Sequence, residues 1–191
     1  MPKIVDHEER KHEIANSALT LFSRQGYHNA TFGDIASASG LSRTNIYNYF
    51  RNKDEIFHYA VGELLDTISG NIEDIIRQQD LSLVQKLQKI YQVFTNEIGE
   101  GKYTSIILDL ALRLKREDTT LAEALDEATK ALRKKIEALF AGETTLLPSP
   151  RIAAATTLFF SLVESSIMRS LFTDSAFIQQ NIGSILRMLG T

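Results

Sequence analysis

The sequence predicts an all-α protein of about nine helices arranged in two domains. Apolar residues recur at the three- and four-residue spacing of helices, and no stretch shows the strict alternation of a half-buried strand. Only three prolines occur in the 191 residues, at positions 2, 148 and 150, so most of the chain contains no strong helix breaker. Short helices are predicted up to residue 53 and long ones beyond it. We therefore expect a small domain over residues 1–53 and a larger one over residues 54–191.

The small domain is expected to hold three helices bounded by recognisable signals. The first begins at Asp6 and ends at Gly26, a residue that readily adopts the positive φ of a helix C-terminus. Thr31 and Asp34 have the spacing of a capping box for the second helix, which stops at Gly40. The predicted buried stripe of the first helix consists of Ile14, Ala18, Leu21 and Phe22.

The larger domain is expected to begin with a long helix, because Asp54 and Glu55 place negative charge at its N-terminus. The later boundaries are marked by glycines, by the loop from Gly142 to Pro150 and by short polar stretches. The expected helices lie at residues 54–78, 82–98, 102–116, 119–140, 151–172 and 175–189.

Residues 32–49 have the pattern of a helix-turn-helix, in which two short helices pack at a steep angle. Ala36 supplies the small residue needed where the helices approach, and Gly40 supplies a turn residue that tolerates positive φ. The third helix of the domain, capped by Ser42 and running to Phe50, is the second helix of this motif. The apolar residues expected to pin the motif to the first helix are Ile35, Leu41 and Ile46.

The third helix is expected to expose a face suited to DNA. If Leu41, Ile46 and Phe50 face the core, the helical period places the polar side chains on the opposite side. That side contains no acid, and its groups can donate hydrogen bonds to groove edges and phosphates. Its members are Arg43, Thr44, Tyr47 and Asn48.

The charge distribution agrees with this interpretation, although the net charge of the chain is -3. Residues 1–53 contain seven Lys and Arg against five Asp and Glu, whereas residues 54–191 contain 14 against 19. A basic head on an acidic body is typical of a DNA-binding protein whose larger domain stays away from the phosphates.

Four short segments within residues 10–60 form a recognisable set. They are Phe22-Ser23-Arg24-Gln25-Gly26-Tyr27, Asp34-Ile35-Ala36, Gly40-Leu41-Ser42, and Ile46-Tyr47-Asn48-Tyr49-Phe50 followed by Lys53-Asp54. Through this set, about a quarter of the chain resembles the TetR family of transcriptional regulators. The resemblance implies a repressor whose N-terminal domain binds DNA and whose C-terminal domain binds a ligand and dimerises.

The resemblance also implies a role for each exposed residue of the motif. The residues expected to contact bases are Arg43, Thr44 and Asn45. Those expected to contact phosphates are Thr31, Tyr47, Tyr49 and Lys53, helped by the N-terminus of the following helix. The family often has Gly or Pro where Thr44 stands, and Thr or Ser where Asn45 stands, so no base preference is transferred.

Structural alternatives exist for four of these assignments. Tyr47 could cover the edge of the first helix, and Tyr49 could pack inward beside Ile46. Lys53 could be a solvated lysine, and Arg43 could contact a phosphate instead of a base.

The central helices of the larger domain are expected to enclose a pocket for an apolar or amphipathic ligand. The candidate lining residues are Tyr91, Phe94, Ile98, Tyr103, Ile106, Ile107, Leu110 and Leu114. Asp109 and Arg113 are candidate polar anchors. The alternative is an ordinary apolar core, with Asp109 and Arg113 forming an i, i+4 ion pair on the surface.

The last two predicted helices carry apolar residues on more than one face, interleaved with small residues, which predicts burial on two sides. The resemblance implies that they pair with their symmetry mates in the four-helix bundle of a homodimer. A two-fold axis would place two recognition helices on successive major-groove faces of a near-palindromic operator. The alternative is the core of a monomer. The candidate interface residues are Leu158, Phe159, Leu162, Ile167, Phe177, Ile182 and Ile185.

Other classes of function find little support in the sequence. The four histidines, at positions 7, 12, 28 and 58, do not have metal-site spacing, and no glycine-rich phosphate loop is present. The absence of cysteine excludes disulfides and thiolate metal sites. We therefore expect no enzyme, cofactor or metal.

The sequence also predicts a cytoplasmic protein. The polar N-terminus lacks the apolar core of a signal peptide, and the apolar stretch 152–172 contains Glu164 and Arg169, which favours a buried helix over a membrane span. An alternative within the DNA-binding class is an architectural or protein-docking member of the family without control by a small molecule.

Overall fold

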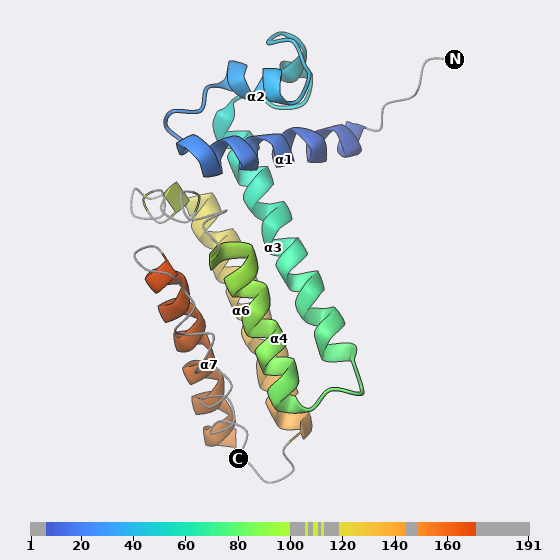
Figure 1. The fold of residues 1–191 in the computed structure, drawn as a ribbon, viewed down its shortest axis with the longest axis vertical. Coiled ribbons are helices and arrows are strands. Elements are labelled where there is room, and N and C mark those ends of the chain that lie inside the picture. The colour runs from blue at the N-terminus through green and yellow to red at the C-terminus, as the bar shows by residue number, and fades with distance from the viewer. Residues whose placement is uncertain are drawn as a thin grey trace, which may run out of the picture. The chain divides into compact units, whose positions relative to one another are not determined.

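Six α-helices and one 3-10 helix form the described part of the chain in the computed structural model (Figure 1). The structure describes residues 7–99, 119–143 and 149–170, together with Ile106, Asp109, Leu110 and Leu112. No strand occurs among these residues, which confirms the predicted all-α fold. The predicted count of about nine helices is not matched. The third predicted helix is a short 3-10 helix, while the helix at 175–189 and most of the helix at 102–116 lie outside the described residues.

The two N-terminal helices end close to their predicted boundaries. α1 (His7–Gln25) stops directly before Gly26, whose φ is 77°. α2 (Phe32–Ala38) begins after Thr31 and is followed by Gly40, whose φ is 67°. Both glycines adopt the left-handed conformation that residues with a Cβ rarely reach.

The prediction of an α-helix over residues 42–50 is wrong in type. The segment contains the four-residue 3-10 helix η1 (Asn45–Asn48). The Ser42 hydroxyl accepts a hydrogen bond from the Asn45 backbone N–H at 3.1 Å, the contact expected of the predicted capping residue. The backbone hydrogen bonds of the segment mix three-residue spacing, as from Tyr49 N–H to the Ile46 carbonyl, with four-residue spacing, as from Phe50 N–H to the same carbonyl. Short polar side chains are weak helix formers inside a helix, because they can hydrogen-bond to nearby backbone groups in other conformations. Those of the segment are Ser42, Thr44, Asn45 and Asn48.

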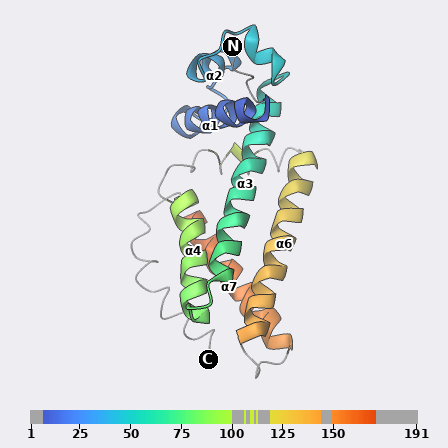
Figure 2. The same cartoon turned by 90° about the vertical axis from the view of Figure 1, so that its right-hand side faces the viewer.

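Four long helices make up most of the remaining described residues. They are α3 (Lys53–Arg77), α4 (Leu83–Gly99), α6 (Thr119–Glu143) and α7 (Ser149–Ser170). Their ends agree with the predicted ends to within three residues. Figure 2 shows the second half of α3 between α4 and α6.

The chain divides into two compact units. Unit 1 comprises Met1–Asp66 and Ser105–Leu121, and unit 2 comprises Thr67–Thr104 and Ala122–Thr191. The chain therefore passes from unit 1 to unit 2 within the sequence of α3, between Asp66 and Thr67, and unit 1 includes a segment from the middle of the sequence. The predicted domain boundary at residue 53 coincides instead with the first residue of α3.

The core of unit 1 is formed by α1, α2, η1 and the first part of α3. α1 packs against α2, and the ring of Phe22 lies 5.5 Å from that of Phe57 between centroids. Leu19 is buried in this core, whereas Leu21, which was expected in the buried stripe, is partly exposed. The fully buried apolar residues of the unit include Ile14, Ala18, Phe22, Ile35, Ile46 and Phe57.

In unit 2, α4 packs against α7 around a buried polar contact. The Tyr91 hydroxyl donates to Ser166 Oγ at 2.7 Å, and the Ser166 hydroxyl donates to the Leu162 carbonyl at 2.7 Å. Burial raises the pKa of the Tyr91 hydroxyl. The fully buried apolar residues of the unit include Ile72, Leu87, Ile90, Phe140 and Phe159.

Within the described residues, one segment, Arg151–Arg169 of α7, is long and apolar enough to cross a membrane by length and composition. One side of this helix is packed into unit 2, in agreement with the predicted buried helix. Its buried residues are Ala155, Thr156, Phe159, Phe160, Val163 and Ser166.

Candidate nucleic-acid interface

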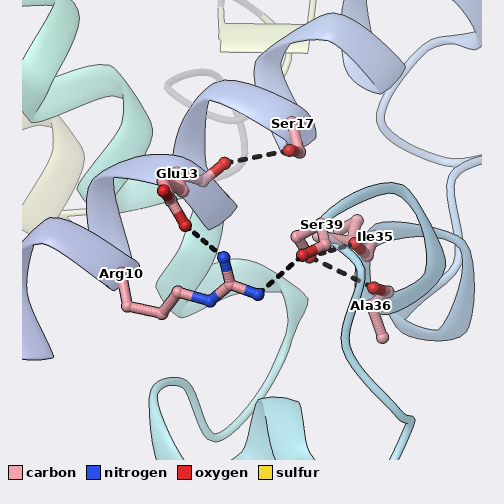
Figure 3. Close-up of polar contacts among 6 residues, drawn as sticks. All are labelled: Arg10, Glu13, Ser17, Ile35, Ala36 and Ser39. Atoms are coloured by element: carbon pink, nitrogen blue, oxygen red, sulfur yellow. Dashed lines mark hydrogen bonds and ion pairs between the residues drawn. The ribbon is translucent and has the colours of Figure 1, made fainter. Parts of the chain in front are cut away.

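A hydrogen bond from α1 to Ser39, the residue that follows α2, supports the turn that precedes η1 (Figure 3). Arg10 donates from one guanidinium nitrogen to the Ser39 carbonyl at 2.9 Å and pairs with Glu13 through another. The Ser39 hydroxyl donates to the Ile35 carbonyl at 2.6 Å. With the chain reversal at Gly40, these contacts fix where η1 begins relative to α1.

The predicted capping box at the start of α2 is confirmed. Thr31 Oγ1 accepts the Asp34 backbone N–H at 3.1 Å, and Asp34 Oδ2 accepts the Thr31 backbone N–H at 2.9 Å. Hydrogen bonding by the side chain of Thr31, and then by its backbone, holds the pKa of the Asp34 carboxyl below its ordinary value. Thr31 therefore stabilises α2, and its exposed position also leaves it accessible to a phosphate.

The three residues expected to contact bases lie together on the exposed side of η1 and the turn before it. Arg43, Thr44 and Asn45 are all exposed. Arg43 has no hydrogen bond or ion pair with any residue that the structure describes. The side-chain amide of Asn48 donates to Asn45 Oδ1 at 2.7 Å, which orients both amides. No acid occurs in residues 42–49, so this surface is suited to a polyanion.

The two tyrosines of η1 and its C-terminus have different surroundings. Tyr47 is 56% exposed, and its ring lies 4.9 Å from that of Phe32 on α2. Tyr49 is partly buried, with its ring 4.9 Å from that of His7 on α1. His7 also donates from Nε2 to the Asn48 carbonyl at 3.2 Å. The N-terminal turn of α1 thus supports the last residues of the segment.

Lys53 binds to the backbone of its own unit, an interaction that the sequence analysis missed. Its Nζ donates to the carbonyls of Tyr27 at 2.6 Å and Ala30 at 2.7 Å. The same ammonium lies 4.1 Å from the centroid of the Tyr27 ring. The two acceptors are 26 and 23 positions away in the sequence, so no local pattern indicates the contact.

Asp109, predicted as an anchor of a ligand pocket, lies in unit 1 and contacts the turn after α1. Its Oδ2 accepts the backbone N–H of Tyr27 at 2.6 Å. The Tyr27 hydroxyl donates to Asp54 Oδ1 at 2.7 Å. The turn that follows Gly26 is thereby joined both to α3 and to the segment around residue 109.

The other residues predicted to line a ligand pocket do not form one group. Tyr91 and Phe94 are buried in unit 2, with exposed fractions of 1% and 8%. Ile106 and Leu110 belong to unit 1 together with Asp109. Outside the described residues or side chains lie Ile98, Tyr103, Ile107, Arg113 and Leu114.

The predicted dimer residues on α7 differ in accessibility. Leu158 is 53% exposed, whereas Phe159 is fully buried within its own chain. Leu162 and Ile167 are partly exposed. Met168, 59% exposed, is an apolar side chain on α7 that was not among the candidates. The candidates Phe177, Ile182 and Ile185 lie outside the described residues.

The histidines of unit 1 make contacts within the fold. His12 pairs with Glu63, which joins α1 to α3, and its ring meets that of Tyr59 at 5.9 Å between centroids. Among the residues that the structure describes, no group of three or more His, Asp or Glu is placed to hold a metal ion.

A short capped helix, a turn at a left-handed glycine and an exposed segment without acids define a helix-turn-helix protein of the DNA-binding class. Residues 14–60 match the model of the family described as bacterial regulatory proteins, tetR family. In this N-terminal segment the chain carries the sequence pattern of the TetR family.

Individual relatives agree with this match. The HTH-type transcriptional regulator HbdR from Aromatoleum sp. (strain CIB) is 42% identical over 71 residues, which cover 37% of this chain and 30% of HbdR. The chain thus spans less than a third of the length of that relative.

Solved structures resemble the chain over nearly its whole length. A putative TetR-family transcriptional regulator from Mesorhizobium loti MAFF303099 has a TM-score of 0.80 at 16% identity, covering 97% of this chain and 96% of the other. The transcriptional regulator FadR from Bacillus subtilis, in complex with stearoyl-CoA, has a TM-score of 0.69 at 20% identity, covering 94% and 98%. At these identities the likeness shows a shared fold.

Proposed function

We propose that the chain is a transcriptional repressor that binds a near-palindromic DNA operator as a homodimer in the cytoplasm and is released by a small ligand. The DNA-binding part rests on one observation. The exposed side of η1 and its preceding turn carries hydrogen-bond donors and no acid, and it is held by the capped α2, the glycine turn and Arg10.

In this proposal the exposed residues divide into two roles. Arg43, Thr44 and Asn45 contact base edges in the major groove, where a guanidinium can donate two hydrogen bonds to a guanine. The residues that contact phosphates are Thr31, Tyr47, Tyr49 and Lys53, and Asn48 orients Asn45. Because Lys53 already donates to two carbonyls, its proposed phosphate contact uses an ammonium fixed by the fold.

Arg43→Ala provides the test of base contact. We expect a loss of about 1–3 kcal/mol in discrimination between operators that differ at the contacted base pair. The operator is first selected from random duplexes, and affinities are then measured by fluorescence anisotropy at fixed salt. Arg24→Ala, which removes an exposed arginine near the end of α1, is the matched control. Equal weakening on every duplex would assign Arg43 to a phosphate instead.

The dimer is proposed from the family match and from the exposed apolar residues of α7. Leu158 and Met168 are more than half exposed in the single chain, and apolar surface of this kind is typical of interfaces. Leu158→Asp is expected to lower the fraction of dimer in sedimentation velocity and to weaken operator binding. A variant that stays monomeric and still binds the full operator with unchanged affinity would contradict the proposed dimeric mode.

Ligand control is proposed from the family and from the solved FadR structure, which contains stearoyl-CoA. The ligand would favour a conformation with low operator affinity, so operator and ligand would weaken each other's binding. A footprint gives the test: we expect one short palindrome near a promoter, released by a compound. Many dispersed sites, with no compound that releases the protein, would favour the architectural alternative.

A further inference from the structure

A cavity of about 470 Å³ lies in unit 2, where the C-terminal end of α3, the first turns of α4 and the second half of α6 meet. This volume is within the range of sites for small molecules, about 300–1,000 Å³. None of the residues predicted to line a ligand pocket contributes to it. The cavity is therefore a second candidate site, distinct from the region around Tyr91 and Phe94.

Basic side chains from three helices line this cavity. They are Arg77 of α3, Lys86 of α4 and Lys135 of α6, and the lining contains one carboxylate, Glu73. Lys86 is 7% exposed, so most of its side chain is removed from water. The Lys135 side chain is 27% exposed and the Arg77 side chain 72% exposed, so the cluster lies in an open depression that an anion can reach from water.

The single carboxylate is shared between two of the cations. Glu73 accepts from Lys135 Nζ at 2.5 Å through one oxygen and from an Arg77 nitrogen at 3.1 Å through the other. The hydrogen bond from Lys135, followed by the charge of Lys135, lowers the pKa of Glu73. Arg77 also pairs with Asp74, an exposed residue outside the lining, at 3.5 Å. Three cations of the lining therefore stand against these two carboxylates.

The rest of the lining is largely apolar. Leu139 is 6% exposed, and Ile76 and Ala138 lie beside it in the lining. Gly142 adds no side chain, and a Cβ built there would meet no atom within 4 Å, which leaves open space at this end of the cavity. Cationic groups beside an apolar wall are complementary to a molecule with an anionic head and a hydrocarbon chain.

We propose that this cavity binds an anionic amphiphile, with its carboxylate or phosphate head group among Arg77, Lys86 and Lys135 and its aliphatic chain along Ile76 and Leu139. As an account of the effector, the inference rests on the proposed function, because such a molecule would be the ligand that controls operator binding. Binding to the cavity itself does not require DNA.

Calorimetric titration of the full chain with dodecanoate tests the site, with dodecyl phosphate as the second head group. We expect saturable binding of at least one of them. Dodecanol, which lacks the negative charge, and acetate, which lacks the long alkyl chain, should bind much more weakly. Equal binding of dodecanol would overturn the role of the cations, and absence of binding of both anions would overturn the proposal.

Charge-removal variants locate the binding. Lys135→Gln and Arg77→Gln are each expected to weaken dodecanoate binding about tenfold, the cost of one hydrogen bond to a charged group. Arg77 serves as the second variant because Lys135 also donates to Ser69 at 2.7 Å, and its loss could alter the fold. Lys130→Gln, an exposed position on α6 paired with Asp126, is the control and should bind normally. Equal weakening by Lys130→Gln, or unchanged binding in both test variants, would remove the site from this cavity.

A separate measurement of operator affinity distinguishes the two proposals. If dodecanoate binds and weakens operator binding, the proposed site and its role as the effector site are both supported. If it binds without any effect on the operator, the site stands and its role as effector fails. If the chain binds its operator but neither anionic probe, the cavity proposal fails alone.

Discussion

Tyr27 shows how one residue can connect distant parts of the chain. Its backbone N–H donates to Asp109, its hydroxyl donates to Asp54, and its carbonyl accepts from Lys53. The Lys53 ammonium also lies against its ring. Hydrogen bonds to charged groups contribute more than neutral ones, about 1.5–3 kcal/mol each. The loop between α1 and α2 therefore depends on charged side chains that come from elsewhere in the sequence.

Lys53→Gln is expected to have two effects. The loss of the charged donor to the Tyr27 and Ala30 carbonyls should lower the free energy of unfolding by about 1–3 kcal/mol in urea denaturation. If Lys53 also contacts a phosphate, the slope of log affinity against log salt should fall by about one unit. An unchanged slope in a folded variant would restrict Lys53 to its structural role.

Thr31→Ala removes the N-cap of α2 and should destabilise the protein by about 1 kcal/mol, whereas Thr31→Ser should keep most of the stability. The pKa of Asp34 is lowered in the folded state. The ionised carboxyl therefore stabilises the fold at pH values above its ordinary pKa of 3.8, and this stabilisation is lost as the pH falls through the folded pKa. In Thr31→Ala the Asp34 pKa should rise towards that ordinary value, as followed by NMR titration. An unchanged Asp34 pKa would contradict the capping-box explanation.

At the scale of elements, the signals that were read correctly are local ones. A capping residue or a glycine at a helix end acts within four residues, so Thr31, Gly26 and Gly40 indicated the ends of α1 and α2. The 3-10 form of η1 reflects the spacing of its backbone hydrogen bonds, which the apolar spacing of Leu41, Ile46 and Phe50 does not reveal. The spacing did predict that Ile46 and Phe50 are buried. Burial depends on which side of the segment faces the core, and the type of helix matters less.

Two glycine substitutions should have opposite effects on the stability of the fold. Gly40→Ala places a Cβ at a φ of 67° and should destabilise by about 1–2 kcal/mol, although no atom lies within 4 Å of that Cβ. Gly70→Ala, an open position inside α3 without positive φ, should stabilise by about 0.5–1 kcal/mol. Thermal unfolding of both variants checks the pair, and a stabilising Gly40→Ala would show that the turn does not require the left-handed conformation.

At the scale of the whole molecule, the division into units was the feature that the sequence predicted least well. Asp109 contacts Tyr27 across 82 positions, and no periodic or capping signal carries information over that distance. From the sequence, Asp109 could be placed only on a helix beside Arg113, so a pocket anchor and a surface ion pair were the natural hypotheses. The exposed face of η1 was predictable, because the apolar and polar residues that define it are only a few positions apart in the sequence.

Asp109→Ala should therefore weaken the turn at Tyr27, although the two residues lie 82 positions apart in the sequence. Loss of the carboxylate leaves the partly buried Tyr27 N–H without its acceptor, which should cost about 1–3 kcal/mol. Hydrogen exchange of the Tyr27 amide should accelerate, and Asp109→Asn should restore part of its protection. Asp126→Ala, which breaks only the exposed pair with Lys130, should cost less than about 1 kcal/mol. Unaltered exchange at Tyr27 in Asp109→Ala would contradict this role.

The split of unit 1 into two stretches of sequence limits how this protein can be recombined. A chimera that joins residues 1–66 to a different C-terminal domain would leave Asp109 behind and would cut α3 at the point where the two units meet. The recipient would have to supply a carboxylate of its own opposite the Tyr27 amide. Evolution by exchange of contiguous gene segments faces the same requirement, so the DNA-binding part and its carboxylate partner have to be inherited together.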